Sequence, residues 1–243
     1  LELFGRRRAW LIGLLAGAAF LTRAPLAFAI PGYALLLAPA GSLAIRGLLD
    51  DAVGWVRRLP WRPWIALGLG VLPALIGFFA YNQVRFGTPL ESGYALASLP
   101  DWLERQRQIG LFSVAHIPMN LDYFLVHLPV PIPAAPFFKP DGLGMSVFLT
   151  SPGLLFALRA DWRDRTVQLL GLTAFLVLVP TLLYYGGGWL QDGYRYFLDS
   201  VPFVVAMCGL AAAHRGGMGF GWKLLIFAGT VVMAFGVYWA YRI

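Results

Sequence analysis

The sequence predicts an all-α, polytopic bundle of transmembrane helices with a long external loop that carries short interfacial helices. Hydrophobic residues make up 59% of the 243 residues and charged residues only 13%, a balance typical of membrane proteins. The apolar stretches are continuous rather than alternating, which argues against a β-barrel, and in lipid such stretches satisfy their backbone polar groups only as helices. We expect residues 1–243 to form a single membrane domain, with residues 87–142 as its external loop.

Charge-free apolar runs are the evidence for the individual helices. Each is, or nearly is, long enough for a helix that spans or half-spans a bilayer. The runs are Ala9–Thr22, Ala24–Ile45, Trp64–Val84, Gly142–Leu158, Thr166–Gln191, Ser200–Ala213 and Leu224–Tyr241.

The first two runs are predicted to form a hairpin of short helices. Basic clusters flank the combined stretch Ala9–Ile45, so both of its ends belong on the same side of the membrane. The break falls at Thr22-Arg23-Ala24-Pro25, because proline lacks an N–H and favours the first turn of a new helix. Arg23 has two interpretations, as a residue of an enzyme cavity or as a turn residue that reaches the interface.

The positions of the basic residues predict the topology. A net charge of +7 could indicate nucleic-acid binding. The basic residues, however, stand in short loops beside apolar runs, where they determine the orientation of membrane helices. No nucleic acid partner is therefore expected. The loop of residues 87–142 and the short Gly186–Tyr194 loop then lie outside. The residues placed in the cytoplasm are Arg6, Arg7, Arg8, Arg46, Arg57, Arg58, Arg62, Arg159, Arg163, Arg165, Arg215 and Lys223.

The long loop is too apolar and aromatic to be disordered. Leu99–Ser113 has a roughly helical rhythm of apolar and charged residues, which favours an interfacial amphipathic helix. The stretch Pro129–Pro133, followed by Pro136 and Pro140, excludes regular helix and predicts an extended chain.

Three groups of short motifs carry a family resemblance. They are Tyr81-Asn82-x-x-Arg85-Phe86-Gly87-x-Pro89 with Glu91 and Gly93-Tyr94; Pro140-Asp141-Gly142 leading to Leu149-Thr150-Ser151-Pro152; and Gly187-Gly188-Trp189 with Gly193-x-Arg195-Tyr196 and Pro202. Together with the first hairpin, they resemble the middle and carboxy-terminal part of bacterial GT-C glycosyltransferases, the protein O-mannosyltransferase and aminoarabinose-transferase group. Tyr194 departs from the proline that many relatives have there.

The resemblance implies a multi-pass protein of the bacterial cytoplasmic membrane that transfers a sugar from a polyprenyl-phosphate carrier. The acceptor would be a lipid, glycan or protein at the external face. In that family the general base is an acidic residue of the first external loop, a region upstream of this chain, so the catalytic residue stays unknown and the chain alone is expected to be inactive. No cofactor is predicted, and dependence on a divalent metal is left open.

The candidate residues for the donor phosphate are Arg195 and Arg85, with Lys139 as a third. Guanidinium and ammonium groups at a membrane interface match the negative charge of a sugar-phosphate leaving group. The alternative is that both arginines are interfacial anchors among aromatic residues. Substrate contacts are assigned to Tyr81, Asn82, Glu91, Tyr94, Trp189, Asp192 and Tyr196.

Other polar residues of the loop receive weaker interpretations. Asp101, Glu104, Asp122 and Asp141 are available as acids but are interpreted as solvated charges. His116, Asp122 and His127 fit neither a zinc nor a calcium spacing, so they are interpreted as surface residues and no metal site is predicted. A multi-span transporter and a non-catalytic membrane scaffold remain the alternatives to an enzyme.

Overall fold

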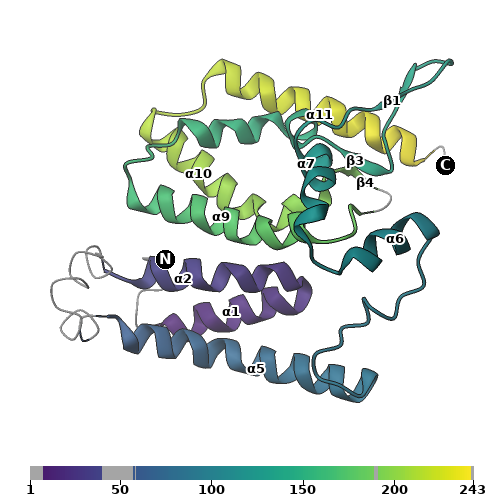
Figure 1. Ribbon diagram of the computed structural model, residues 1–243. Coiled ribbons are helices and arrows are strands. Elements are labelled where there is room, and N and C mark those ends of the chain that lie inside the picture. Colours follow the sequence, from purple (N-terminus) through teal and green to yellow (C-terminus); the bar gives the residue numbers. More distant parts are fainter. Residues whose placement is uncertain (1–7, 40–56, 58, 189–190, 242–243) are drawn as a thin grey trace. The chain divides into compact units, whose positions relative to one another are not determined.

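The computed structural model describes residues 8–39, 57, 59–188 and 191–241, and these are mostly helical (Figure 1). The chain divides into two compact units, residues 1–97 and residues 98–243. The predicted external loop of residues 87–142 therefore contributes to both units. Each unit is described here by itself.

Three helices are long and apolar enough to cross a membrane, which indicates a membrane protein. They are Trp61–Phe86, Arg165–Leu183 and Phe220–Ala240. Shorter apolar helical segments cover Ala9–Thr22, Ala24–Leu37 and Val201–His214. All six helical segments overlap the charge-free runs found in the sequence.

The first unit contains α1 (Ala9–Thr22), the 3-10 helix η2 (Ala24–Ala29), α2 (Ile30–Leu37) and α5 (Trp61–Phe86). The predicted break is observed: α1 ends at Thr22, Arg23 is extended with φ −150°, and Pro25 opens η2. Helix α5 ends where Gly87 adopts a left-handed conformation with φ 78°, which glycine takes without steric cost. The Trp64 indole fastens α5 to α2 by donating to the Ala34 carbonyl at 2.9 Å.

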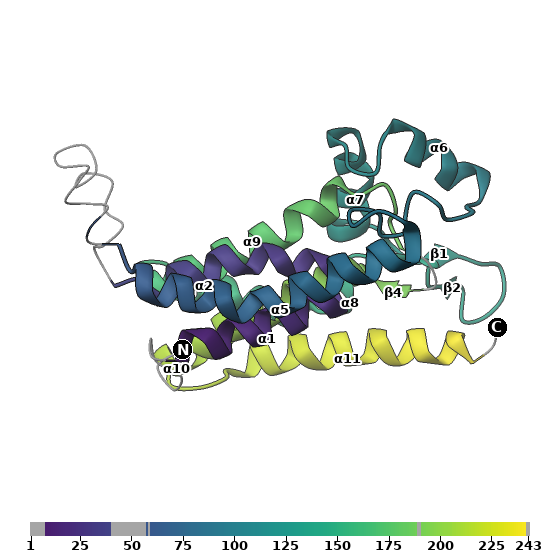
Figure 2. The same ribbon diagram turned by 90° about the horizontal axis from the view of Figure 1, so that it is seen from below.

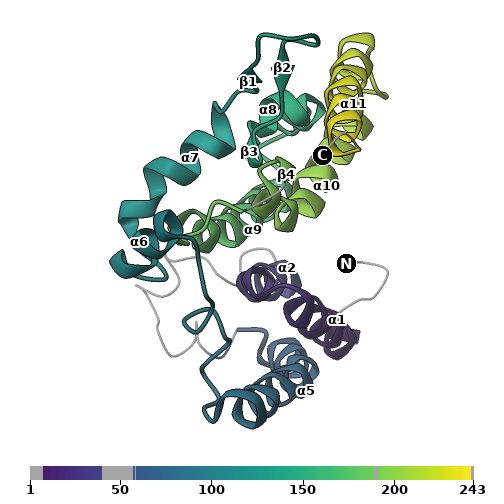
Figure 3. The ribbon, with the colours of Figure 1, turned by 90° about the vertical axis from the view of Figure 1, so that its right-hand side faces the viewer.

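Small residues allow α1 and α5 to pack with their backbones in contact. A Cβ built on Gly13 would lie 2.0 Å from the Leu67 carbonyl oxygen, and one on Gly70 would lie 2.0 Å from that of Trp10. One turn further along, Gly17 faces Ala74. This is the small-xxx-small arrangement by which membrane helices approach closely, and Figure 3 shows the two helices side by side.

The second unit begins with short elements and continues into longer apolar helices. The short elements are α6 (Asp101–Ile109), η3 (Val114–His116), α7 (Ile117–Leu125), β1 (Val130–Pro131), β2 (Phe138–Lys139) and β3 (Leu143–Met145). The remaining elements are α8 (Val147–Thr150), η4 (Pro152–Arg159), α9 (Arg165–Leu183), β4 (Gln191–Gly193), η5 (Arg195–Asp199), α10 (Val201–His214) and α11 (Phe220–Ala240). The helix expected within Leu99–Ser113 is α6, and the extended chain expected at Pro129–Pro133 contains β1.

The apolar run Gly142–Leu158 does not form one continuous helix. It is divided into β3, the four-residue α8 and the 3-10 helix η4. The Ser146 hydroxyl caps α8 by accepting from the Phe148 N–H at 3.1 Å. Pro152 then starts η4. Serine caps and proline therefore override the apolar composition, which alone predicted a single helix.

The core of the second unit lies where η4, α9 and α10 meet. Trp222 of α11 stacks on Phe156 with ring centroids 3.9 Å apart and donates to the Gly153 carbonyl at 3.0 Å. Polar caps close the helix ends: Asp164 caps α9, and the Asn120 amide donates to the carbonyls of Leu182 and Tyr184. The buried core residues are Ala157, Ala160, Val167, Met207, Cys208 and Ala211.

Two small sheets shape the end of this unit. Strands β1 and β2 form an antiparallel hairpin (Figure 2). Strand β3 pairs in parallel with β4 (Figure 3). The β3–β4 pair joins segments that the whole of α9 separates in sequence. This parallel pair positions most of the polar residues considered next.

Candidate functional site

A group of polar side chains gathers on the segments that β3 and β4 hold together. In the parallel ladder Leu143 pairs with Gln191 and Met145 with Gly193. We call the group Asp122, His127, Lys139, Asp141, Gln191 and Arg195 the β3–β4 site. Its members come from α7, the chain that follows α7, β2, β4 and η5.

The Gln191 side chain connects the segments around β3 and β4 by hydrogen bonds. Its amide nitrogen donates to the carbonyl oxygens of Leu143 and, at 2.7 Å, of Gly187. Its amide oxygen accepts the Arg195 backbone N–H at 3.3 Å. Gly188 has φ 102°, and a Cβ there would meet the Gln191 amide at 2.5 Å. The glycines of this loop therefore allow the chain to fold tightly over Gln191.

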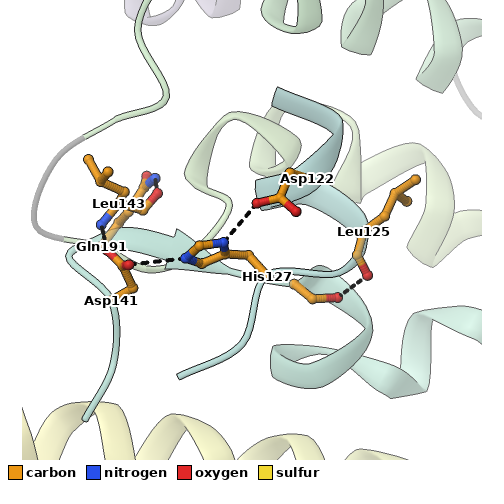
Figure 4. A network of polar contacts seen from close by, with 7 residues as sticks. Asp122, Leu125, His127, Asp141, Leu143 and Gln191 are labelled. Carbon is orange, nitrogen blue, oxygen red and sulfur yellow. Dashed lines mark hydrogen bonds and ion pairs between the residues drawn. The ribbon is translucent and has the colours of Figure 1, made fainter. Parts of the chain in front are cut away.

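The imidazole of His127 bridges two carboxylates (Figure 4). Its Nδ1 lies 2.8 Å from Asp122 Oδ2, and its Nε2 lies 3.0 Å from Asp141 Oδ2. The other Asp141 oxygen accepts the Leu143 backbone N–H at 2.8 Å. Asp141 is thus fixed at both oxygens, whereas half of the Asp122 side chain is exposed.

The environment shifts the ionisation of this cluster toward the charged forms. Burial alone would lower the pKa of His127, but its hydrogen bonds to Asp141 and Asp122 and their charges outweigh that effect and raise the pKa above 6.5. For Asp141, burial acts to raise the pKa. The Leu143 N–H, His127 and Lys139 together outweigh it and lower the pKa below 3.8. The two carboxylates thus favour the protonated imidazolium, while His127 and the Leu143 N–H favour the ionised form of Asp141.

Two of the three cations predicted for the donor phosphate belong to this site. Lys139, on β2, is exposed, and its charge reaches Asp141. Arg195 is exposed at the start of η5, with its guanidinium carbon 5.7 Å from the centre of the Tyr196 ring. The preceding Tyr194 is buried, and its hydroxyl donates to the Thr181 carbonyl at 3.4 Å. Because Tyr194 anchors the chain inward, Arg195 faces solvent.

Asp192 lies against the last turns of α11. A Cβ built on Gly236 would be 2.6 Å from the carboxyl carbon of Asp192, so only glycine leaves room for it. Burial raises the pKa of Asp192 above its ordinary value of 3.8. Trp189, another substrate-contact prediction, lies outside the described residues.

The remaining predicted residues belong to the first unit, around the end of α5. Arg85 Nη1 donates to the Tyr81 hydroxyl at 2.7 Å, and its guanidinium carbon is 5.1 Å from the centre of the Phe86 ring. This arrangement is compatible with the anchor interpretation and with a phosphate role. The structure therefore places Arg85 and Arg195 in different units.

The turn after α5 is organised by two of the predicted substrate contacts. Asn82 is buried, and its amide donates to the Pro89 carbonyl at 3.2 Å. A Glu91 carboxylate oxygen accepts the Gly93 backbone N–H at 2.6 Å. Both side chains thus stabilise the local turn, while Tyr94 is exposed.

The interpretation of His116, Asp122 and His127 as ordinary surface residues is wrong for His116 and incomplete for the other two. His116 is fully buried, and its Nε2 lies 3.0 Å from the Gly110 carbonyl oxygen. Asp122 and His127 join Asp141, which is fourteen residues beyond His127. The proline-rich segment between them predicted an extended chain and not the hairpin that returns Asp141 to His127.

The described residues contain no group of three His, Cys, Asp or Glu side chains arranged to hold a metal ion. The polar groups of the β3–β4 site are two carboxylates, one imidazole, the Gln191 amide and two exposed cations. Carboxylates accept hydrogen bonds from hydroxyl groups, and cations bind anionic oxygens.

The same unit contains an apolar cavity of about 520 Å³, which is not lined by the residues of the β3–β4 site. It lies between α8, η4, η5, α10 and α11, and Thr150, Leu198 and Met233 are among its lining residues. Thr150 also contacts β4, since a Cβ on Gly193 would lie 3.0 Å from the Thr150 hydroxyl oxygen. A second, smaller apolar cavity of about 250 Å³ is lined by other residues of the same unit.

Comparison with known proteins finds no family model, no characterised protein and no solved structure that matches this chain.

Proposed function

We propose that this protein is a glycosyltransferase of the bacterial cytoplasmic membrane that uses a polyprenyl-phosphate-linked sugar and acts at the external face. The observation that carries the proposal is that the second unit holds both the polar β3–β4 site and this apolar cavity, whose lining residue Thr150 contacts Gly193 of β4. A lipid-linked sugar phosphate has a long apolar chain joined to a charged, hydroxyl-rich head. The second unit offers both environments, and Thr150 connects the cavity to β4.

The cations of the site account for phosphate binding. Arg195 presents a planar fork of donors that matches two phosphate oxygens, and Lys139 adds a point charge. Both are exposed and stand on segments that the β3–β4 ladder joins. As the glycosidic bond breaks, negative charge develops on the phosphate, so these cations would favour the transition state over the bound donor.

The carboxylates of the site account for sugar recognition. Asp141 is held ionised by His127 and by the Leu143 N–H, so it accepts hydrogen bonds from sugar hydroxyls. Its lowered pKa makes it a weak base. Removal of the acceptor's proton is therefore assigned to another carboxylate, as the family resemblance implies.

The reaction fixes what an experiment must detect. The bond between the anomeric carbon and the phosphate oxygen breaks, a bond to the acceptor oxygen forms, and the polyprenyl phosphate leaves. The full-length protein in proteoliposomes is supplied with a radiolabelled polyprenyl-phosphate sugar. We expect labelled acceptor, whereas movement of label across the bilayer without transfer would favour a transporter.

Substitution at Arg195 tests the assignment of the phosphate site. Arg195→Ala is expected to lower transfer by roughly 30-fold to 1000-fold, corresponding to about 2–4 kcal/mol. Arg195→Lys should lose less, because the charge remains without the fork. Arg105→Ala on α6 is the control, since Arg105 is also exposed but lies outside the β3–β4 site. An Arg195→Ala protein with unchanged transfer and donor affinity would leave that arginine as an interfacial anchor.

A further inference from the structure

The hairpin of residues 130–139 projects from the second unit (Figure 3). Its strands β1 and β2 pair Val130 with Lys139 and Pro131 with Phe138. The Ile132 N–H donates to the Phe137 carbonyl at 2.8 Å, and the Phe137 N–H donates to the Ala134 carbonyl at 2.8 Å. The hairpin is therefore a defined structure whose tip is residues 133–137.

The surface of the hairpin is apolar. No charged residue occurs from Leu128 to Phe138, and the Phe137 and Phe138 side chains are 59% and 51% exposed. Phe137 has φ 71°, in the left-handed region that bulky residues rarely occupy. Such a conformation has a cost, so the hydrogen bonds of the tip hold an exposed aromatic ring in an unfavourable backbone state.

The base of the hairpin is fixed to the rest of the unit. The His127–Asp141 contact closes the chain just outside the two strands. The Ser146 backbone N–H donates to the His127 carbonyl at 2.9 Å, which ties the same point to the start of α8. The tip is thus presented on a fixed stem rather than at the end of a loose loop.

The position of the stem relative to α11 shows at what depth the tip lies. Beyond the stem, β3 pairs with β4, and Asp192 of β4 packs on Gly236 of α11. The next residues of α11 are aromatic: Tyr238, Trp239 and the exposed Tyr241. Tyrosine and tryptophan mark the level where lipid headgroups meet the acyl chains. The hairpin therefore leaves the protein near that level.

We propose that the hairpin 130–139 is a membrane-contacting wedge, with Phe137 and Phe138 inserted at the headgroup–acyl boundary of the leaflet where α11 ends. Lys139, at its base, would lie among the lipid phosphates. Exposed aromatic residues on a charge-free tip match an interface more closely than open water. This proposal goes beyond the sugar transfer and does not depend on it.

Depth measurements on the full-length protein test the proposal. Phe137→Cys and, separately, Phe138→Cys are spin-labelled in a Cys208→Ala background and placed in lipid nanodiscs. Collision rates with oxygen, which concentrates in lipid, and with a water-soluble nickel chelate are compared. The references are Arg163→Cys in an exposed turn and Val231→Cys on the exposed face of α11.

We expect the ratio of oxygen to nickel collisions at positions 137 and 138 to lie several-fold above that at 163 and toward that at 231. A ratio equal to that at 163 would overturn the proposal, because the tip would be in water. Labels shielded from both reagents would also overturn it, because a protein surface rather than lipid would then cover the tip. Two adjacent positions guard against the loss of one variant to misfolding.

Discussion

His127 lies between two carboxylates, Asp122 and Asp141, so its charge state affects the stability of their contacts. The His127 and Asp141 side chains each retain about a quarter of their exposed surface, so solvent only partly screens their contact. Because the pKa of His127 is raised, the contact's contribution to stability is complete below pH 6.5 and is lost as the pH rises through the raised value. Because the pKa of Asp141 is lowered, its contribution is complete above pH 3.8 and is lost as the pH falls through the lowered value.

The raised pKa of His127 predicts that the effect of His127→Gln on stability depends on pH. At pH 6 the substitution should lower the free energy of unfolding by about 1 kcal/mol, since a hydrogen bond to a charged partner is lost. At pH 9 the wild-type imidazole is itself more nearly neutral, so the difference should shrink. Thermal unfolding midpoints of both proteins across this pH range provide the measurement. Asp101→Asn is the control, and a difference independent of pH would contradict the imidazolium assignment.

The residue contacts of the β3–β4 site were only partly predictable. The residue types of Arg195 and Lys139 indicated anion binding, because charge beside an interface is visible in the sequence. The pairing of His127 with Asp122 and Asp141 was not visible, because no fixed spacing encodes it. It depends on the return of the chain around a hairpin and on the backbone N–H of Leu143.

At the scale of elements, the close backbone packing of α1 and α5 predicts that substitutions at different glycines of these helices differ sharply in how much they destabilise the protein. Gly13→Leu and Gly70→Leu should each destabilise the first unit by about 1–3 kcal/mol or more, because the new side chain meets backbone atoms. Gly68→Leu is the matched control, since a Cβ there meets nothing within 4 Å. Denaturation in mild detergent, followed by circular dichroism, compares the three variants. Equal losses of stability for Gly68→Leu and Gly70→Leu would contradict the close backbone packing of α1 and α5.

Elements were predictable where one local signal dominates. Helices α5, α9 and α11 follow from length and apolar composition, and the α1–η2 break follows from Pro25. The run Gly142–Leu158 was not predictable as β3, α8 and η4, because β3 needs its partner β4 from a distant part of the chain. Composition carries no information on that pairing.

At the scale of the second unit, the basic residues collect where η4 and α10 end and α9 and α11 begin. Arg159, Arg165, Arg215 and Lys223 stand at these helix ends. Strand β4 lies near the opposite ends of α9 and α11, because Tyr194 bonds the Thr181 carbonyl and Asp192 meets Gly236, and Arg195 follows directly after Tyr194. Figure 1 shows β4 there. The positive-inside rule assigns the first group to the cytoplasm.

Topology is tested by cysteine substitution at Asp101 and at Arg163 in intact cells, with Cys208 replaced by alanine. An impermeant thiol reagent should label position 101 and not position 163, because α6 belongs to the side of Arg195 and the turn at 163 to the other. Labelling after permeabilisation is the control that both sites are reactive. Labelling of 163 alone would reverse the orientation and, with it, the side on which sugar transfer is proposed.

The parallel pairing of β3 with β4 has a consequence for biosynthesis. The ribosome completes β3 before α9 and delivers β4 only after α9, and proteins fold progressively from the amino terminus as they are made. Until the chain beyond α9 has been made, β3 has no partner strand, and Gln191 cannot yet bind the Leu143 carbonyl. Maturation of the β3–β4 site is therefore expected to wait for synthesis of the chain beyond α9, and a nascent chain stalled at Leu183 would carry Asp141 but neither Gln191 nor Arg195.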